Sequence, residues 1–138
     1  MGTCVDGKTM LSFIPLTLLL CGAVYGAEHH IKTADEFVAF SNNVNKGTSY
    51  SGYTVFLDSD IDLTGKAINP IGSQKKYFIG SFDGQGHVIS NLQMLVSSST
   101  YCLSGLFGYT TGATVKNVVM DESCSITNSV NGGYVSMA

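Results

Sequence analysis

The sequence predicts an all-β fold: a solenoid of short parallel strands, about three coils long, that begins with one capping α-helix. A helical period occurs only over 33–45, and β-rich segments with Gly-containing corners follow from position 53 onward. Similar segments recur at 61–63, 89–92 and 115–118, with Leu63, Leu92 and Val118 at equivalent positions. The resulting period, in the twenties, is typical of repeats that stack on one another.

The segment 1–26 predicts an export signal. The stretch 10–23 is mostly apolar, and Val24, Tyr25 and Gly26 place small or modest side chains before a cleavage point after Gly26. The run is shorter than the roughly 20 apolar residues of a membrane-spanning helix. A buried N-terminal helix of the mature fold is the alternative, as is lipidation at Cys21.

Three regions follow from this. We expect a signal peptide over 1–26, an N-terminal segment with the capping helix over 27–52, and the coils over 53–138. We therefore expect the protein to be secreted or held at the cell surface.

The composition argues against a nucleic-acid partner. The chain of 138 residues is 44% hydrophobic and 12% charged, its net charge is -3, and all seven basic residues are lysines. Phosphate binding relies on clustered Lys and Arg and on bidentate Arg. Disorder is also unexpected at this hydrophobicity.

The helix has local start and stop signals. Thr33 and Glu36 have the spacing of a capping box, in which each side chain bonds the other residue's backbone amide. Phe37, Phe40 and Val44 follow near helical spacing and predict the buried face. Gly47 predicts the end of the helix.

The strands are short and lie between turns. We expect them over 54–57, 61–63, 78–82, 87–92, 103–109 and 114–120, with a tight turn over 83–86. The residues expected to face the interior of the coils are Ile61, Leu63, Ile89, Leu92, Leu106, Phe107, Val115 and Val118.

Part of this stretch resembles a known family, the GLUG-motif repeat. The resemblance covers about 33–120, and its motif residues are Phe82, Asp83, Gly84, Gly86, His87, Ile89, Leu92, Gly105, Leu106, Phe107 and Gly108. It implies a right-handed parallel β-helix in a secreted or surface protein, either adhesin-like or attached to a metallopeptidase. The residues from Gly132 resemble the start of a second motif, so we expect a fragment whose coils are incomplete at the C-terminus. The alternative is a complete short protein that associates with itself through the open last coil.

Two groups of residues suggest binding or cross-linking. Asp58, Asp60 and Asp62 alternate on one strand and could collect a calcium ion, but an EF-hand would need Gly and Glu at the positions of Leu63 and Asn69. A solvated outer face is the alternative for these aspartates. Export would make Cys102 and Cys124 a candidate disulfide, and two free buried thiols are the alternative.

No catalytic, cofactor or metal-binding residues are predicted. His29 and His30 lack further zinc ligands, and His87 lacks a nucleophile or acid beside it, so we expect it to bond the backbone of the turn. Asp83 could pair with Asp121 or Glu122, but a turn aspartate that accepts from backbone amides explains it better.

The function expected from these observations is a non-catalytic secreted or cell-surface module, adhesive or structural, whose partner is an unknown extracellular protein or glycan. One alternative is a non-catalytic appendage of a larger exported enzyme such as a metallopeptidase. The other is a polysaccharide-active β-helix enzyme, although the absence of Arg leaves no visible basic groove for an acidic sugar.

Overall fold

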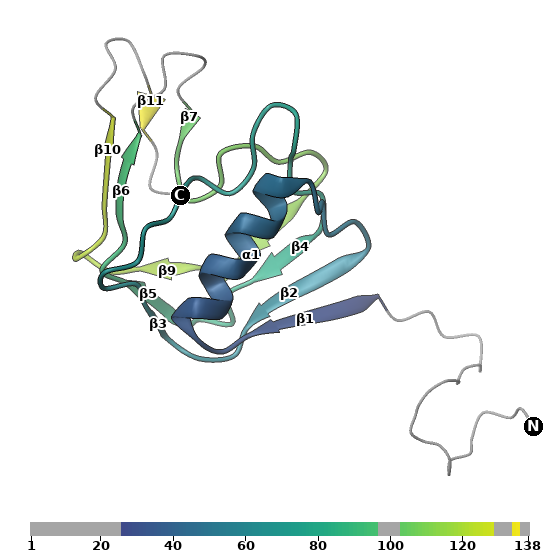
Figure 1. Cartoon of the computed structure of the whole chain (residues 1–138). Helices are drawn as coiled ribbons and strands as arrows, with labels where there is room; N and C mark the ends of the chain where they lie inside the picture. Colours follow the sequence, from purple (N-terminus) through teal and green to yellow (C-terminus); the bar gives the residue numbers. More distant parts are fainter. Residues whose placement is uncertain (1–25, 97–102, 129–133, 136–138) are drawn as a thin grey trace, which may run out of the picture.

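The computed structural model describes residues 26–96, 103–128 and 134–135 (Figure 1). The predicted signal peptide therefore lies almost entirely outside the described residues, as does Cys102. The elements, in chain order, are β1 (Ala27–Ile31), α1 (Ala34–Lys46), β2 (Tyr53–Leu57), β3 (Ile61–Asp62), β4 (Ser81–Asp83), β5 (Val88–Ser90), β6 (Gln93–Val96), β7 (Leu103–Ser104), β8 (Thr114–Lys116), β9 (Val119–Met120), β10 (Ser125–Asn128) and β11 (Tyr134–Val135).

The strands form small parallel sheets. One sheet has the order β1-β2-β4-β8 and a second the order β3-β5-β9, while β10 pairs with β6 and β11 with β7. Among the described residues, the pairs between these strands are all parallel. Segments far apart in the chain therefore lie side by side: Ala27 is opposite Tyr53, for example, and Gln93 is opposite Ser125.

The helix prediction is confirmed. Thr33 is the N-cap, its hydroxyl accepts from the Glu36 amide, and the Glu36 carboxylate accepts from the Thr33 amide, so the capping box is complete. Gly47 ends α1 with a positive φ of 121°, which an L side chain would strain. The buried face carries Phe37, Phe40 and Val44, as predicted.

α1 closes one end of the hydrophobic core. Figure 1 shows the helix lying across β2 and β4. The rings of Phe37 and Phe40 pack against Phe82 of β4, with centroids 6.4 and 5.7 Å away, and Phe40 also contacts Phe78. All four rings are fully buried. The helix thus contributes directly to the core that the strands share.

The predicted fold class, an all-β right-handed parallel β-helix of about three coils, is wrong. The described residues have mixed α/β character, with one helix, Ala34–Lys46, and very short strands divided among separate small sheets. The spacing between paired strands is also uneven, because the step along the chain from Val55 to its partner Phe82 is shorter than the step from Phe82 to its partner Val115. Short, uneven segments joined by irregular backbone do not build the regular coils that the period suggested.

The predicted equivalence of three segments is wrong for the last of them. Ile61 pairs with Ile89 as expected, but Ile89 then pairs with Met120, whereas Val115 pairs with Phe82 of a different sheet. The segment 115–118 therefore spans a bend between two sheets.

The predicted interior residues are mostly buried. Ile61, Leu63, Ile89, Leu92 and Leu106 are at most 2% exposed. Phe107 and Val118 are partly buried, and Val115 is 43% exposed. The exposed residue belongs to β8, an edge strand, where no further strand of the described residues covers it.

Candidate functional site

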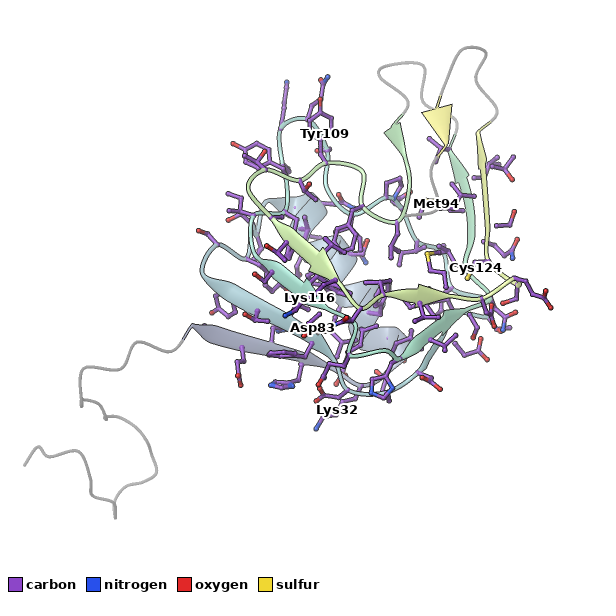
Figure 2. All side chains as sticks on the ribbon, turned by 180° about the vertical axis from the view of Figure 1, so that it is seen from behind. Lys32, Asp83, Met94, Tyr109, Lys116 and Cys124 are labelled. Atoms are coloured by element: carbon purple, nitrogen blue, oxygen red, sulfur yellow. The ribbon has the colours of Figure 1, made fainter. Side chains whose placement is uncertain are left out.

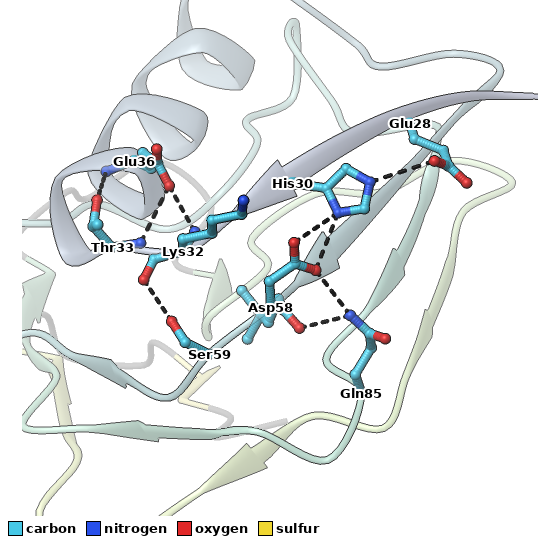
Figure 3. Close-up of polar contacts among 9 residues, drawn as sticks. Glu28, His30, Lys32, Thr33, Glu36, Asp58, Ser59 and Gln85 are labelled. Atoms are coloured by element: carbon cyan, nitrogen blue, oxygen red, sulfur yellow. Dashed lines mark hydrogen bonds and ion pairs between the residues drawn. The ribbon is translucent and has the colours of Figure 1, made fainter.

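The residues that sequence analysis singled out for binding lie on an exposed corner between β2 and β3. Asp58 follows β2, Asp60 precedes β3, and Asp62 lies in β3. We call these three residues the aspartate row. Each bonds side chains or backbone from segments far away in the chain, and Figure 3 shows the contacts around Asp58.

Asp58 is bonded from the strands on both sides of it. Its carboxylate lies 2.9 and 3.0 Å from Nδ1 of His30, on β1, while the other ring nitrogen of His30 lies 3.4 Å from Glu28 (Figure 3). Gln85 Nε2 donates to Asp58 at 3.1 Å and to the Leu57 carbonyl at 2.8 Å. One side chain thus ties β1, β2 and the turn after β4 together.

This contact changes the ionisation of both partners. Hydrogen bonds to Asp58 and then Glu28 raise the pKa of His30 above its ordinary value, because carboxylates favour the charged imidazolium. The hydrogen bond from His30 lowers the pKa of Asp58, and Gln85 adds to that effect. At neutral pH the carboxylate is ionised and accepts these bonds.

Asp60 bonds the segment that leads into β5. Its Oδ1 accepts from the Val88 amide at 2.9 Å and lies 3.2 Å from His87 Nδ1. These contacts lower the pKa of Asp60, the backbone amide contributing most. His87 therefore bonds a carboxylate of the preceding segment with its side chain, which corrects the expectation that it would bond the turn backbone. The backbone contact belongs to its own amide, which donates to the Gly84 carbonyl at 2.9 Å.

Asn91, after β5, and Asn117, after β8, make the same kind of contact with an aspartate of a neighbouring segment. Asn91 donates from Nδ2 to Asp62 at 3.0 Å, and Asn117 donates from Nδ2 to Asp83 at 3.0 Å. Both asparagines have a φ of 56°, the left-handed conformation that Asn tolerates better than most residues. Bonds from Thr64, followed by Asn91, lower the pKa of Asp62. The same contact thus joins neighbouring segments twice.

Asp83 is the turn residue that the sequence predicted. Its Oδ1 accepts from the Gln85 amide at 2.9 Å, and the Lys116 ammonium lies 3.6 Å from Oδ2. The bond from Asn117 contributes most to lowering the pKa of Asp83. Asp121 bonds the Ser123 amide and hydroxyl in its own loop. The turn interpretation of Asp83 is therefore confirmed.

Glycine is required at the centre of this turn. A Cβ on Gly84 would overlap the carbonyl oxygen of Asn117 and lie 3.0 Å from its carbonyl carbon and from the Cα of Val118. The Gly84 amide donates to Lys116 and the Gly86 amide to Asn117, each at 3.0 Å. Gly84 and Gly86 therefore let the backbone of this turn approach the backbone of residues 116–118 closely.

The apolar motif residues all belong to the core or its rim. Phe82, Ile89, Leu92 and Leu106 are buried, and the Phe107 ring packs on Phe82 with centroids 5.2 Å apart. The Gly108 amide donates to the Ile71 carbonyl at 2.9 Å, and Gly105 is buried. These residues therefore serve packing and backbone pairing.

The aspartate row does not form a common cation site. Asp58, Asp60 and Asp62 each turn to a different set of donors. Within the ranges that the structure describes, no three His, Cys, Asp or Glu side chains gather closely enough to hold a metal ion.

The predicted disulfide involves a residue outside the described ranges, Cys102. Its proposed partner, Cys124, is a buried free thiol whose Sγ donates to the Ile89 carbonyl at 3.3 Å.

Sequence reasoning missed the contribution of the N-terminal histidines. Both lie in β1, which was not predicted because Glu28, His29 and His30 lack β-branched side chains. The His29 ring lies 5.2 Å from Tyr50 and 6.2 Å from Phe40, while His30 stacks on Phe56 at 5.3 Å. Only the apolar Ile31 at the end of the segment indicated a strand position facing the core.

Comparison with family models, with curated proteins and with solved structures finds no match for this chain. None of the helices that the structure describes is long and apolar enough to cross a membrane.

Proposed function

We propose that the chain is a non-catalytic secreted or cell-surface module with an adhesive or structural role. The proposal is supported mainly by the hydrogen bonds that the carboxylates of the aspartate row accept. Asp58, Asp60 and Asp62 all accept hydrogen bonds from segments at least 27 positions away, so they serve to hold neighbouring segments together.

The exposure of these contacts supports the same role. Side chains of His30 and Glu28 are 43% and 61% exposed, while that of Asp83 is only 15% exposed. A surface whose segments are joined by hydrogen bonds in this way keeps a fixed shape in solvent. Such a surface suits a module that binds a partner. The resemblance to GLUG-motif chains and the apolar segment 10–23 favour export as its destination.

Export is tested by expressing the full chain with its own N-terminus in a secreting host. We expect the protein in the medium or on the cell surface, with an intact mass that corresponds to cleavage after Gly26. Replacing the three leucines at 18–20 by Asn is the matched control, and it should keep the protein inside the cell. Retention of the unchanged chain in the cytosol, at its full mass of 14.6 kDa, would contradict export.

The adhesive role is tested separately with the exported protein. Beads coated with it should bind immobilised extracellular glycoproteins or glycans more than beads coated with the same protein after heat unfolding. Incubation with pectin and with glycosaminoglycans should leave polymer length unchanged. Depolymerisation of either substrate would instead support the enzyme alternative.

A further inference from the structure

The end of the core opposite α1 has no helix of the described residues across it. Figure 2, seen from behind, shows β8 and β9 at this end, with interior side chains visible between the strands. We call residues 113–127, which contain β8, β9 and most of β10, the open end. Each of these three strands is at the edge of its sheet among the described residues.

Side chains at paired positions on successive strands form rows that face the core. In each row the side chain at the open end is more exposed than the ones before it. Val55 and Phe82 are 0% exposed, yet Val115, which is next in the same row, is 43% exposed. Ile61 and Ile89 are at most 1% exposed, while Met120 beyond them is only partly buried. A third row shows the same trend: Met94 is 3% exposed and Ile126 next to it is partly buried. The described part of the core therefore ends here without an apolar cover.

The backbone of β8 also offers hydrogen-bonding groups at its free edge. The Thr114 amide donates to Gly80, and the Lys116 carbonyl accepts from Gly84, so both of these groups point toward β4. In a strand, successive residues turn their amide and carbonyl to opposite sides. The amide and carbonyl of Val115 therefore point away from β4, to the free edge.

We propose that a second copy of this chain covers the open end, with β8 pairing antiparallel to its counterpart across a two-fold axis through Val115. In that arrangement the two Val115 residues exchange both backbone hydrogen bonds, as directly opposed residues do in an antiparallel pair. Their side chains meet on the inward face, where the described residues place no strand beyond Val115.

The charges of the open end fit a second copy. Lys116 is the only charged residue over 113–120, and its ammonium already lies 3.6 Å from Asp83. Antiparallel pairing about Val115 places Lys116 opposite Thr114 of the other copy, so the two lysines do not face each other. The acidic residues of the open end, Asp121 and Glu122, follow β9 and lie outside the β8 edge. That edge is therefore nearly neutral and matches an identical edge better than a strongly charged partner.

The two-fold arrangement limits the association to two copies. Further stacking would have to use β1, the other edge strand of the same sheet, which is a different surface from β8. A two-fold pair uses the same surface twice and closes.

The test is the mass of the purified full chain measured by light scattering over a range of concentrations. We expect twice the monomer mass, with dissociation on dilution. Val115→Lys should raise the dissociation constant by about tenfold or more, because it would bury a charge between the two edges. Leu95→Lys is the matched control: Leu95 is 68% exposed on β6, which belongs to a different sheet from β8, and the change should leave the mass unaltered.

A second variant keeps the proposal testable if Val115→Lys does not fold. Val115→Pro removes the amide that faces the free edge and no bond to β4, and Pro is tolerated on edge strands in that orientation. It should give a folded monomer, as judged by circular dichroism. A wild-type mass of one chain up to about 100 μM, growth beyond two chains, or a dimer unaffected by Val115→Pro would each overturn the proposal.

Discussion

His30 and Asp58 show how the polar residues of this protein act. They come from β1 and from the end of β2, 28 positions apart, and each has a second partner, Glu28 and Gln85 respectively. Because solvent screens such exposed pairs, each one adds little to stability. Their main effect is to fix which segment lies next to which.

The pairing of His30 should be visible in its titration. Its pKa is raised by Asp58 and Glu28, so the stabilisation from this contact is complete below the ordinary histidine value and is lost as the pH rises through the folded-state pKa. Asp58→Asn should therefore move the His30 pKa down toward 6.5, measured by NMR of the imidazole protons.

Asp60→Asn is the control for that measurement, because Asp60 bonds His87 and leaves His30 untouched. An Asp58→Asn variant whose His30 titrates as in the unchanged protein would show that the contact is absent in solution.

At the scale of elements, sequence reasoning succeeded where the signals are local. The capping box of Thr33 and Glu36 and the spacing of Phe37, Phe40 and Val44 are complete within one stretch of chain, and α1 follows them. β6 and β10 were missed because Gln93–Val96 and Ser125–Asn128 have no apolar alternation strong enough to separate them from loops. They are strands because they pair with each other, although they lie far apart in the chain.

Strand register shows the limit of local pattern most clearly. Asn91 and Asn117 share the same φ and the same contact with an aspartate of a neighbouring segment, so the two stretches do look alike locally. Yet the residues before them pair in different sheets: Ile89 pairs with Met120, and Val115 with Phe82. Register depends on which side chains meet across the core, and the local pattern of one stretch does not show which they are.

The turn at Gly84 should be sensitive to an added side chain. Gly84→Ala would force a Cβ into the Asn117 backbone, which cannot yield without moving β8, and we expect a loss of about 2 kcal/mol in the free energy of unfolding. Urea denaturation measures it.

Gly86→Asn is the matched control, because nothing lies within 4 Å of a Cβ there and Asn tolerates the φ of 77°. Its expected cost is below about 1 kcal/mol. Equal losses for the two variants would mean that the close approach of Gly84 and Asn117 does not exist in solution.

The whole molecule is organised around one core that the helix and the sheets share. The sequence identified part of this core, including Phe37, Phe40 and Ile89, because apolar side chains in periodic positions are buried in most arrangements. It did not reveal that a helix and short sheets together make a mixed α/β fold, because the same buried residues are compatible with regular coils.

Phe40 tests that arrangement, since its ring contacts His29 on β1, Tyr50 before β2, and Phe78 and Phe82 from the other segments. Phe40→Ala should lower the free energy of unfolding by about 3–5 kcal/mol, a large share of the total stability of a small domain. Tyr77→Ala, an aromatic truncation at a site 37% exposed, should cost far less. A small loss for Phe40→Ala in urea denaturation would show that α1 is not part of the core.

Acid should destabilise the molecule as a whole, because its segments are joined by ionised carboxylates. Hydrogen bonds lower the pKa of Asp58, Asp60, Asp62 and Asp83 below 3.8. A lowered folded-state pKa contributes stability above the unfolded value, and that contribution is lost as the pH falls through the folded-state value. The urea midpoint should therefore change little between about pH 7 and pH 5 and fall modestly below about pH 3.8, because solvent screens each of these exposed contacts.

Asp60→Asn separates this effect from general acid sensitivity, since its amide oxygen still accepts from the Val88 amide but no longer titrates. The variant should lose less stability between pH 5 and pH 2 than the unchanged protein. A midpoint that stays flat down to pH 2 would show that these carboxylates make no such bonds in solution, and the joining of the segments would then rest on the core and the backbone pairing alone.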